Sequence, residues 1–179
     1  MKILFIASNP NTQDSLEVER EINDLQQRLL KADKRGGIEL KVLSNLAIED
    51  FASVMLDQQP DILHIAAHGI PKNKLLLASK NGTEVRLSAG QLRDLLGAIP
   101  VRPSLVFLNA CTSANFAKEL TAVTSFAIGM TSKIGNPGAV ASTAVFYEWL
   151  AEGATIAKAY QAANAMLRCI DTSGVEMSL

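Results

Sequence analysis

The sequence predicts an α/β fold, with a mostly parallel sheet and helices on both of its faces. Short apolar runs alternate with segments of helical periodicity from one end of the chain to the other. The apolar runs are continuous instead of alternating with polar residues, which is typical of parallel strands that are covered on both faces. This order of elements predicts a doubly wound sheet with right-handed crossovers.

Each strand of this sheet is predicted from one apolar run. The predicted strands are Lys2–Ala7, Ile38–Leu43, Asp61–Ala67, Ser104–Ala110 and Ser125–Met130. Between the third and fourth of them, Leu75–Leu77 and Glu84–Arg86 flank Asn81-Gly82, a dipeptide that favours a tight turn. We therefore expect a small hairpin inserted after the third strand.

The helices are predicted from capping patterns at their first residues. Asp14 with Glu17, and Ser88 with Gln91, form capping-box patterns. The first of these precedes an apolar stripe at helical spacing that includes Leu25 and Leu29. Other helices are expected to be capped at Asn45, Ser113, Asn136 and Thr155.

Length and composition narrow the class of protein. With 179 residues, 48% of them hydrophobic, the chain is expected to fold as a single domain over residues 1–179. Because 17 basic residues balance 18 acidic ones, neither nucleic acid nor a membrane surface is expected as a partner. The N-terminal apolar run is too short for a signal peptide or a membrane span, so a cytoplasmic location is predicted.

Two candidate reactive groups follow consecutive predicted strands. His68-Gly69 ends the third strand and Cys111 ends the fourth. Neighbouring parallel strands lie about 5 Å apart, so their ends bring imidazole and thiol close together. An imidazole that accepts the thiol proton activates the sulfur as a nucleophile. We therefore expect His68 to be the general base, Cys111 the nucleophile, and the N–H groups of Gly69 and Cys111 an oxyanion hole.

A family resemblance rests on the same two stretches. Leu63–Gly69 and Leu105–Ser113 resemble the apolar-strand–His-Gly and apolar-strand–Ala-Cys-x-Ser blocks of CHAT domains, which belong to the caspase-like cysteine peptidases. The resemblance covers nearly the whole chain. It implies a three-layer caspase-like fold with a flavodoxin-like strand order, and peptide-bond hydrolysis by a Cys–His dyad without a metal or dissociable cofactor.

The resemblance also implies a set of partners. The expected substrate is a protein or peptide, in a bacterial signalling, cell-death or defence pathway. CHAT domains are often joined to sensor or repeat domains, so a regulatory or sensor protein is a second expected partner. The Gln-Ala-Cys-x-Gly signature of caspases themselves is absent, since Cys111 lies between Ala110 and Thr112.

Several polar residues near the strand ends are candidate substrate contacts: Asn9, Asn109, Ser113, Thr131 and Asn136. Ser113 and Asn109 have simpler interpretations, as a helix cap and a turn residue. His64, inside a strand, is interpreted as a buried, hydrogen-bonded histidine, and Cys169 as a packing residue on the last helix.

The sequence also predicts the charge of the specificity pocket. The segments expected to form its walls carry only Lys72 and Lys133 as charged residues, which favours a neutral residue at the cut. This holds unless Asp14, Asp61 or Glu84 folds into the pocket.

Two other functions compete with the peptidase. A catalytically silent CHAT-fold module that binds a partner protein would not need both His68 and Cys111. A flavodoxin-like or receiver-type ligand domain would need an acidic cluster or a phosphate loop at the strand ends, and the sequence has neither.

Overall fold

The strands form one mixed sheet. A computed structural model describes residues 1–9, 22–27, 29, 37–133, 136–171 and 174–179. Within these residues the main sheet has the order β2-β1-β3-β6-β7-β8, and a β4-β5 hairpin continues from β3. The strands are β1 (Lys2–Ser8), β2 (Glu39–Ser44), β3 (Ile62–Ile70), β4 (Lys74–Ala78), β5 (Glu84–Ser88), β6 (Leu105–Asn109), β7 (Phe126–Met130) and β8 (Met177–Ser178).

The predicted fold class and strand order are confirmed. The strands β1, β2, β3, β6 and β7 pair in parallel, and without the hairpin their order is the flavodoxin-like one. Two features differ from the prediction. β3 continues three residues further, to Ile70, because Gly69 and Ile70 pair with β4. β8 was not predicted; it is two residues long and antiparallel to β7, too short for an apolar pattern.

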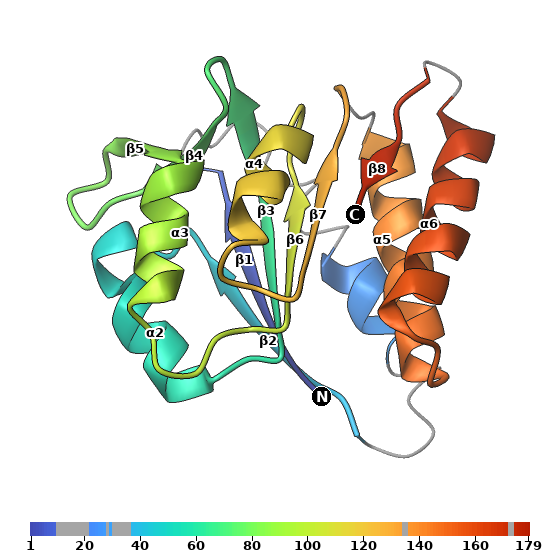
Figure 1. Ribbon diagram of the computed structural model, residues 1–179, viewed down its shortest axis with the longest axis horizontal. Helices are drawn as coiled ribbons and strands as arrows, with labels where there is room; N and C mark the ends of the chain where they lie inside the picture. Colours follow the sequence, from blue (N-terminus) through green and yellow to red (C-terminus); the bar gives the residue numbers. More distant parts are fainter. Residues whose placement is uncertain (10–21, 28, 30–36, 134–135, 172–173) are drawn as a thin grey trace.

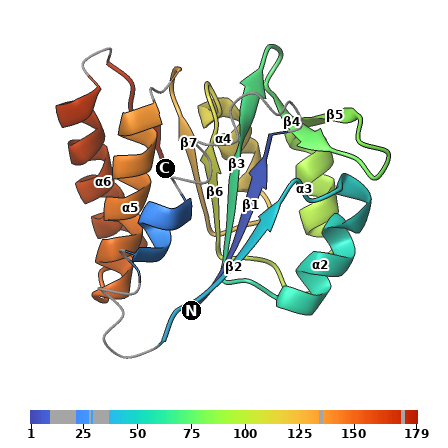
Figure 2. The ribbon, with the colours of Figure 1, turned by 180° about the vertical axis from the view of Figure 1, so that it is seen from behind.

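Helices cover both faces of this sheet, which gives three layers (Figure 1). One face carries α2 (Phe51–Gln58), α3 (Ala89–Gly97) and α4 (Ala114–Leu120), with the short helix η2 (Ile48–Asp50) preceding α2. The other face carries α5 (Asn136–Ala151), α6 (Ile156–Ile170) and the helical residues 22–27 (Figure 2).

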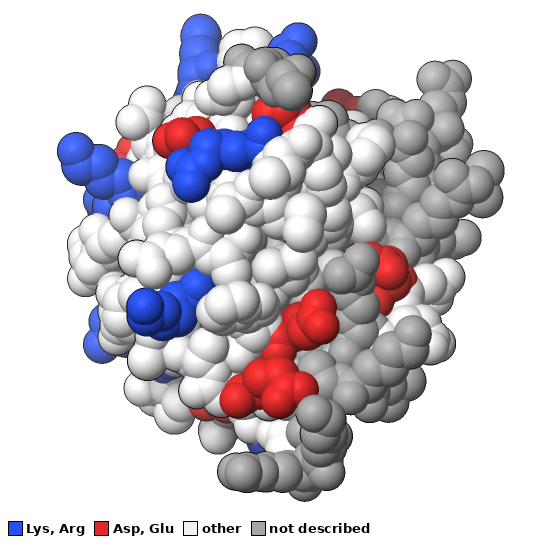
Figure 3. All heavy atoms as spheres, turned by 90° about the vertical axis from the view of Figure 1, so that its right-hand side faces the viewer, with Lys and Arg blue, Asp and Glu red and all other residues white. Residues whose placement is uncertain are grey.

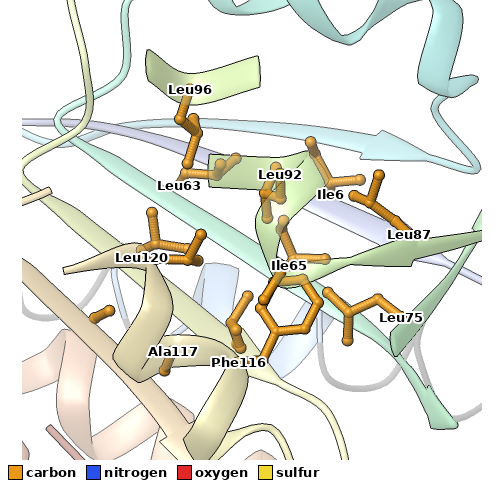
Figure 4. Packing of buried hydrophobic residues seen from close by; sticks show 14 of the residues in the cluster. Ile6, Leu63, Ile65, Leu75, Leu87, Leu92, Leu96, Phe116, Ala117 and Leu120 are labelled. Atoms are coloured by element: carbon orange, nitrogen blue, oxygen red, sulfur yellow. The ribbon is translucent and has the colours of Figure 1, made fainter. Parts of the chain in front are cut away.

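Each helical layer encloses its own apolar core. Between the sheet and α3 and α4, buried side chains such as Leu63, Leu92 and Phe116 pack together (Figure 4). On the other face, Leu25 and Leu29 are buried against the sheet, as the apolar stripe predicts. Burial of this kind stabilises the folded state by about 25 cal/mol per Å² of apolar surface. Both layers therefore hold the strand ends in register.

The helix caps agree with the sequence patterns at two positions and differ at a third. Ser88 and Gln91 form the predicted capping box, and the hydroxyl of Thr155 accepts a hydrogen bond from the N–H of Lys158. The prediction for Asn45 is wrong, because η2 is preceded by Ala47 at its N-cap position. Asn45 instead has a φ of 51° and accepts a hydrogen bond from the N–H of Asn9. The pattern at Asp14 and Glu17 lies outside the described residues.

Candidate functional site

The strand register places three of the predicted site residues side by side. Ala7, Ala66 and Asn109 are paired across β1, β3 and β6. Two residues further along the chain from these three lie Asn9, His68 and Cys111, here called the row; Asn9 and Cys111 follow the last residues of β1 and β6, and Cys111 lies in a turn. Neighbouring strands are about 4.8 Å apart. The two residues of the predicted dyad therefore both lie at the carboxyl end of the sheet, on the neighbouring strand β3 and just after β6.

A close backbone contact supports this placement independently. A Cβ atom at position 69 would lie 2.0 Å from the carbonyl oxygen of Cys111 and 3.1 Å from its backbone nitrogen. Only glycine fits there, because no real Cβ approaches a backbone oxygen so closely. The His68-Gly69 segment is thus in direct contact with the backbone of Cys111, although more than forty positions of sequence separate them.

The loop that carries Cys111 is fixed from two sides. Thr112 has a φ of 53°, and its N–H donates a 3.1 Å hydrogen bond to the carbonyl of Ser132, which follows β7. The Ser113 hydroxyl points to the carbonyls of Leu108 and Ala110, 3.2 and 2.7 Å away, and accepts a 3.0 Å bond from the N–H of Met130. These bonds hold the loop against both β6 and β7.

A second glycine allows the same loop to approach β7. A Cβ atom at Gly129 would lie 2.5 Å from the carbonyl oxygen of Ser113. Ser113 does occupy the N-cap position of α4, as predicted, but its side chain makes no capping bond. Its hydroxyl is 2% exposed and fixes the loop instead, an arrangement that favours a structural role over contact with a substrate.

The two reactive side chains differ in exposure. His68 is exposed and Cys111 is half-buried, so both are open to a bound molecule from the same end of the sheet. Cys169, the other thiol, is exposed on α6. The structure thus separates the two cysteines by environment: one lies in the row of polar residues, and the other on the outer surface of a helix.

Asn9 is the third polar side chain of the row. It is 9% exposed, and neither its Oδ1 nor its Nδ2 has a hydrogen-bond partner among the described residues. The neighbouring hydroxyl of Ser8 is buried and unpaired in the same sense. A buried amide without a partner costs about 1–3 kcal/mol. An incoming polar group would remove this penalty, so the side chain suits substrate binding.

His64 lies on β3, four residues before His68. Its side chain is 0% exposed and its ring stacks between Phe5 and Phe107, at centroid distances of 4.2 and 4.7 Å. Its Nδ1 lies 3.0 Å from the hydroxyl of Tyr147 on α5. Burial lowers the pKa of His64 to about 3, because the interior does not solvate the charged ring. The prediction of a buried, hydrogen-bonded histidine is confirmed.

The other predicted contacts lie in different environments. Asn109 is 8% exposed, one row below Cys111. Thr131 is exposed, but its hydroxyl donates to the carbonyl of Glu176 and accepts from the N–H of the same residue, both at 3.0 Å. Thr131 therefore anchors the segment that leads to β8. Asn136 begins α5, and its side chain lies outside the described part of the chain.

The described residues form neither a metal cluster nor a membrane-spanning helix. They contain no group of three or more His, Cys, Asp or Glu side chains placed to hold a metal ion. None of the helices among them combines the length and apolar composition that a bilayer span requires. The cytoplasmic location stays a prediction.

Proteins with related sequences are named as proteases. The chain is 26% identical over 153 residues to a "Probable protease" of Gillisia limnaea, and 23% identical over 174 residues to a "Roc-COR-CHAT protease" of an unidentified prokaryote. These alignments include 84% and 93% of the chain, but only 27% and 16% of the two relatives. The chain thus spans about a quarter or less of the curated relatives it matches.

Solved structures with a similar fold are caspase-like. A secreted C11 cysteine protease of Bacteroides thetaiotaomicron, "iotapain", superposes with a TM-score of 0.65 at 12% identity, over 92% of this chain and 61% of that one. The Drosophila initiator caspase Dronc superposes with a TM-score of 0.54 at 9% identity, over 93% and 72%. At these identities the likeness establishes the fold alone, which is caspase-like.

A family model describes almost the entire chain. The CHAT domain model matches residues 4–174, a range that includes the row of Asn9, His68 and Cys111 and both helical layers. Together with relatives named as proteases and a caspase-like fold, this match supports a cysteine peptidase family. The chain therefore belongs to the CHAT domain family.

Proposed function

We propose that the protein is a cysteine endopeptidase that hydrolyses peptide bonds of a protein substrate with His68 and Cys111. The observation that supports this proposal is the contact between Gly69 and the backbone of Cys111, because it brings the residue after His68 against the residue that carries the thiol. Both side chains are open to solvent at one end of the sheet, where α/β proteins bind their ligands.

The proposed reaction has two halves. The Cys111 thiol gives its proton to the His68 imidazole while its sulfur attacks the carbonyl carbon of the scissile bond. The imidazolium then donates that proton to the leaving amine as the C–N bond breaks, which leaves a thioester on Cys111. In the second half, His68 takes a proton from water while the hydroxide oxygen attacks the thioester carbon. The C–S bond then breaks, the peptide leaves as a carboxylic acid, and His68 returns the proton to the Cys111 sulfur.

Backbone and side-chain donors near the thiol support the same reaction. We infer that the N–H groups of Gly69 and Cys111 stabilise the oxyanion of the tetrahedral intermediate. The N–H of Thr112 already donates to Ser132, which excludes it from this role in the described geometry. The buried Asn9 amide, unpaired among the described residues, is proposed to bind the substrate backbone next to the cut.

The proposal is tested by an unbiased cleavage profile in a peptide library. Wild-type protein should produce a reproducible set of cuts, Cys111→Ala should produce none, and Cys169→Ala, the matched cysteine control, should reproduce the wild-type set. The proposal is wrong if Cys111→Ala makes the same cuts as wild type. A wild type that makes no cut would favour the catalytically silent module that binds a partner.

A further inference from the structure

A basic groove lies beside the proposed dyad, on the hairpin that continues from β3. The groove has a volume of about 570 Å³. Three of its lining residues are apolar, Ile70, Pro71 and Leu76, and four are charged, Lys72, Lys74, Glu84 and Arg86. In Figure 1 the β4-β5 hairpin follows β3 at the carboxyl end of the sheet.

The register connects this groove to His68. Leu76 on β4 pairs with His68, and Arg86 on β5 pairs with Leu76. Lys74 pairs with Ile70, two residues beyond His68. Residues paired across a sheet, and residues two apart along a strand, lie on the same face. The groove and the His68 side chain are therefore on one continuous face of the hairpin.

The charge of the groove is positive. Three of its lining residues are cations and one, Glu84, is an anion. Lys72 and Arg86 are exposed, whereas Lys74 is half-buried. Positive φ angles of 67° and 54° at Lys72 and Asn73 form the turn. The Asn73 amide lies 3.5 Å from the Glu119 carboxylate on α4, which links this turn to the helix after Cys111.

This concentration of positive charge is local. The whole chain has a net charge of -1. The view onto the side that carries α6 shows separate basic side chains towards its top and left and a group of acidic side chains towards its lower end (Figure 3). A basic groove on a nearly neutral protein attracts anionic groups to one place, which sets the orientation of a peptide that binds there.

The chemistry of the dyad indicates which part of a substrate enters the groove. The imidazole that protonates the leaving amine must lie beside the segment that follows the cut. Arg86 is two strands away from His68, or about 10 Å, and an extended peptide covers that distance in about three residues. The groove cations are therefore placed for residues roughly two to four positions after the cut.

We propose that the groove formed by Lys72, Lys74 and Arg86 binds acidic residues of the protein substrate, two to four positions after the scissile bond. The proposal rests on the peptidase function proposed above. It complements the expectation of a neutral residue at the cut itself, since the cations lie beyond His68. Of the acids considered as pocket residues, Asp61 lies at the opposite end of the sheet, where it binds the N–H of Lys2.

The test uses one sequence from the library with Glu, Gln or Lys at the second to fourth positions after the cut. For wild type, kcat/KM should be about tenfold higher with Glu than with Lys, because each exposed ion pair contributes about 0.2–1 kcal/mol. In Lys74→Glu/Arg86→Glu the order should reverse. Lys158→Glu, at an exposed lysine on α6, is the control for a charge reversal outside the groove and should keep the wild-type order.

A binding measurement separates this proposal from the peptidase proposal. Fluorescence anisotropy of the same labelled peptides on Cys111→Ala needs no cleavage, and the Glu peptide should bind about tenfold more tightly than the Lys peptide. The preference should shrink between 0.05 and 0.5 M salt, as screening predicts for exposed charges, on the order of several-fold. Equal binding, a preference for Lys through Glu84, or a Glu preference unaffected by Arg86→Glu would each overturn the groove proposal, whether or not wild type cleaves peptides.

Discussion

His64 makes the stability of the fold sensitive to acid, and the size of the effect follows from its environment. The ring is 0% exposed between two aromatic side chains, and its pKa falls from 6.5 to about 3 on burial. The unfolded chain therefore binds a proton at a higher pH than the folded chain does. As the pH falls below 6.5, unfolding is favoured by about 1.4 kcal/mol per pH unit, until the folded protein also binds the proton near pH 3.

The matched variant is His64→Phe. Phenylalanine keeps an aromatic ring between Phe5 and Phe107 but cannot be protonated. Between pH 7.5 and 4.5, wild type should lose about 3 kcal/mol more stability than this variant, since the lower pH is two units below 6.5. The carboxylates titrate alike in both proteins, so their contribution cancels in the comparison.

Urea unfolding at pH 7.5, 6.5, 5.5 and 4.5 measures this difference. At pH 7.5 the variant loses the contact with the Tyr147 hydroxyl, so its absolute stability is not the relevant quantity. The difference between the two free energies of unfolding, plotted against pH, should be flat above 6.5 and sloped below it. A difference independent of pH would show that His64 is solvated or charged in the folded state, and the reasoning would be refuted.

Two further predictions concern the dyad's surroundings. Gly69→Ala should destabilise the protein by about 1–3 kcal/mol or displace the Cys111 loop, because its Cβ would lie 2.0 Å from the Cys111 carbonyl. In contrast, Gly90→Ala within α3 should be neutral or stabilising, because the nearest atom to its Cβ, a guanidinium nitrogen of Arg93, would lie 3.8 Å away. Thermal melts that rank the two variants equally would contradict the packing. Iodoacetamide at neutral pH should alkylate half-buried Cys111 faster than exposed Cys169, and His68→Ala should remove that advantage. Exposure alone predicts the opposite order, so faster labelling of Cys169 in wild type would count against an activated thiol.

The sequence predicted the sheet well because its parallel strands are continuous apolar runs. It also predicted that His68 and Cys111 belong to neighbouring strands, which requires only the strand order, but His68 lies within β3 and not after it. The contact of Gly69 with the Cys111 backbone was not predictable at this detail, since it depends on the path of the loop after β6.

Other features depend on contacts that no local pattern encodes. Ser113 follows the pattern of an N-cap, yet its hydroxyl bonds to Met130 on another strand. Asn45 likewise follows the pattern of a cap, but its side-chain oxygen accepts a hydrogen bond from the N–H of Asn9. The basic groove combines Lys74 and Arg86 from two strands of the hairpin, so it appears only when their register is known.

The central claim is that His68 and Cys111 act as one catalytic unit. The most direct measurement is kcat/KM on the best library peptide for wild type, Cys111→Ala, His68→Ala and the double variant. Because proton transfer and thiol attack belong to one mechanism, each single variant should lose all detectable hydrolysis and the double variant should be no worse. Retention of wild-type cleavage by Cys111→Ala, or by His68→Ala with both proteins folded, would contradict the account.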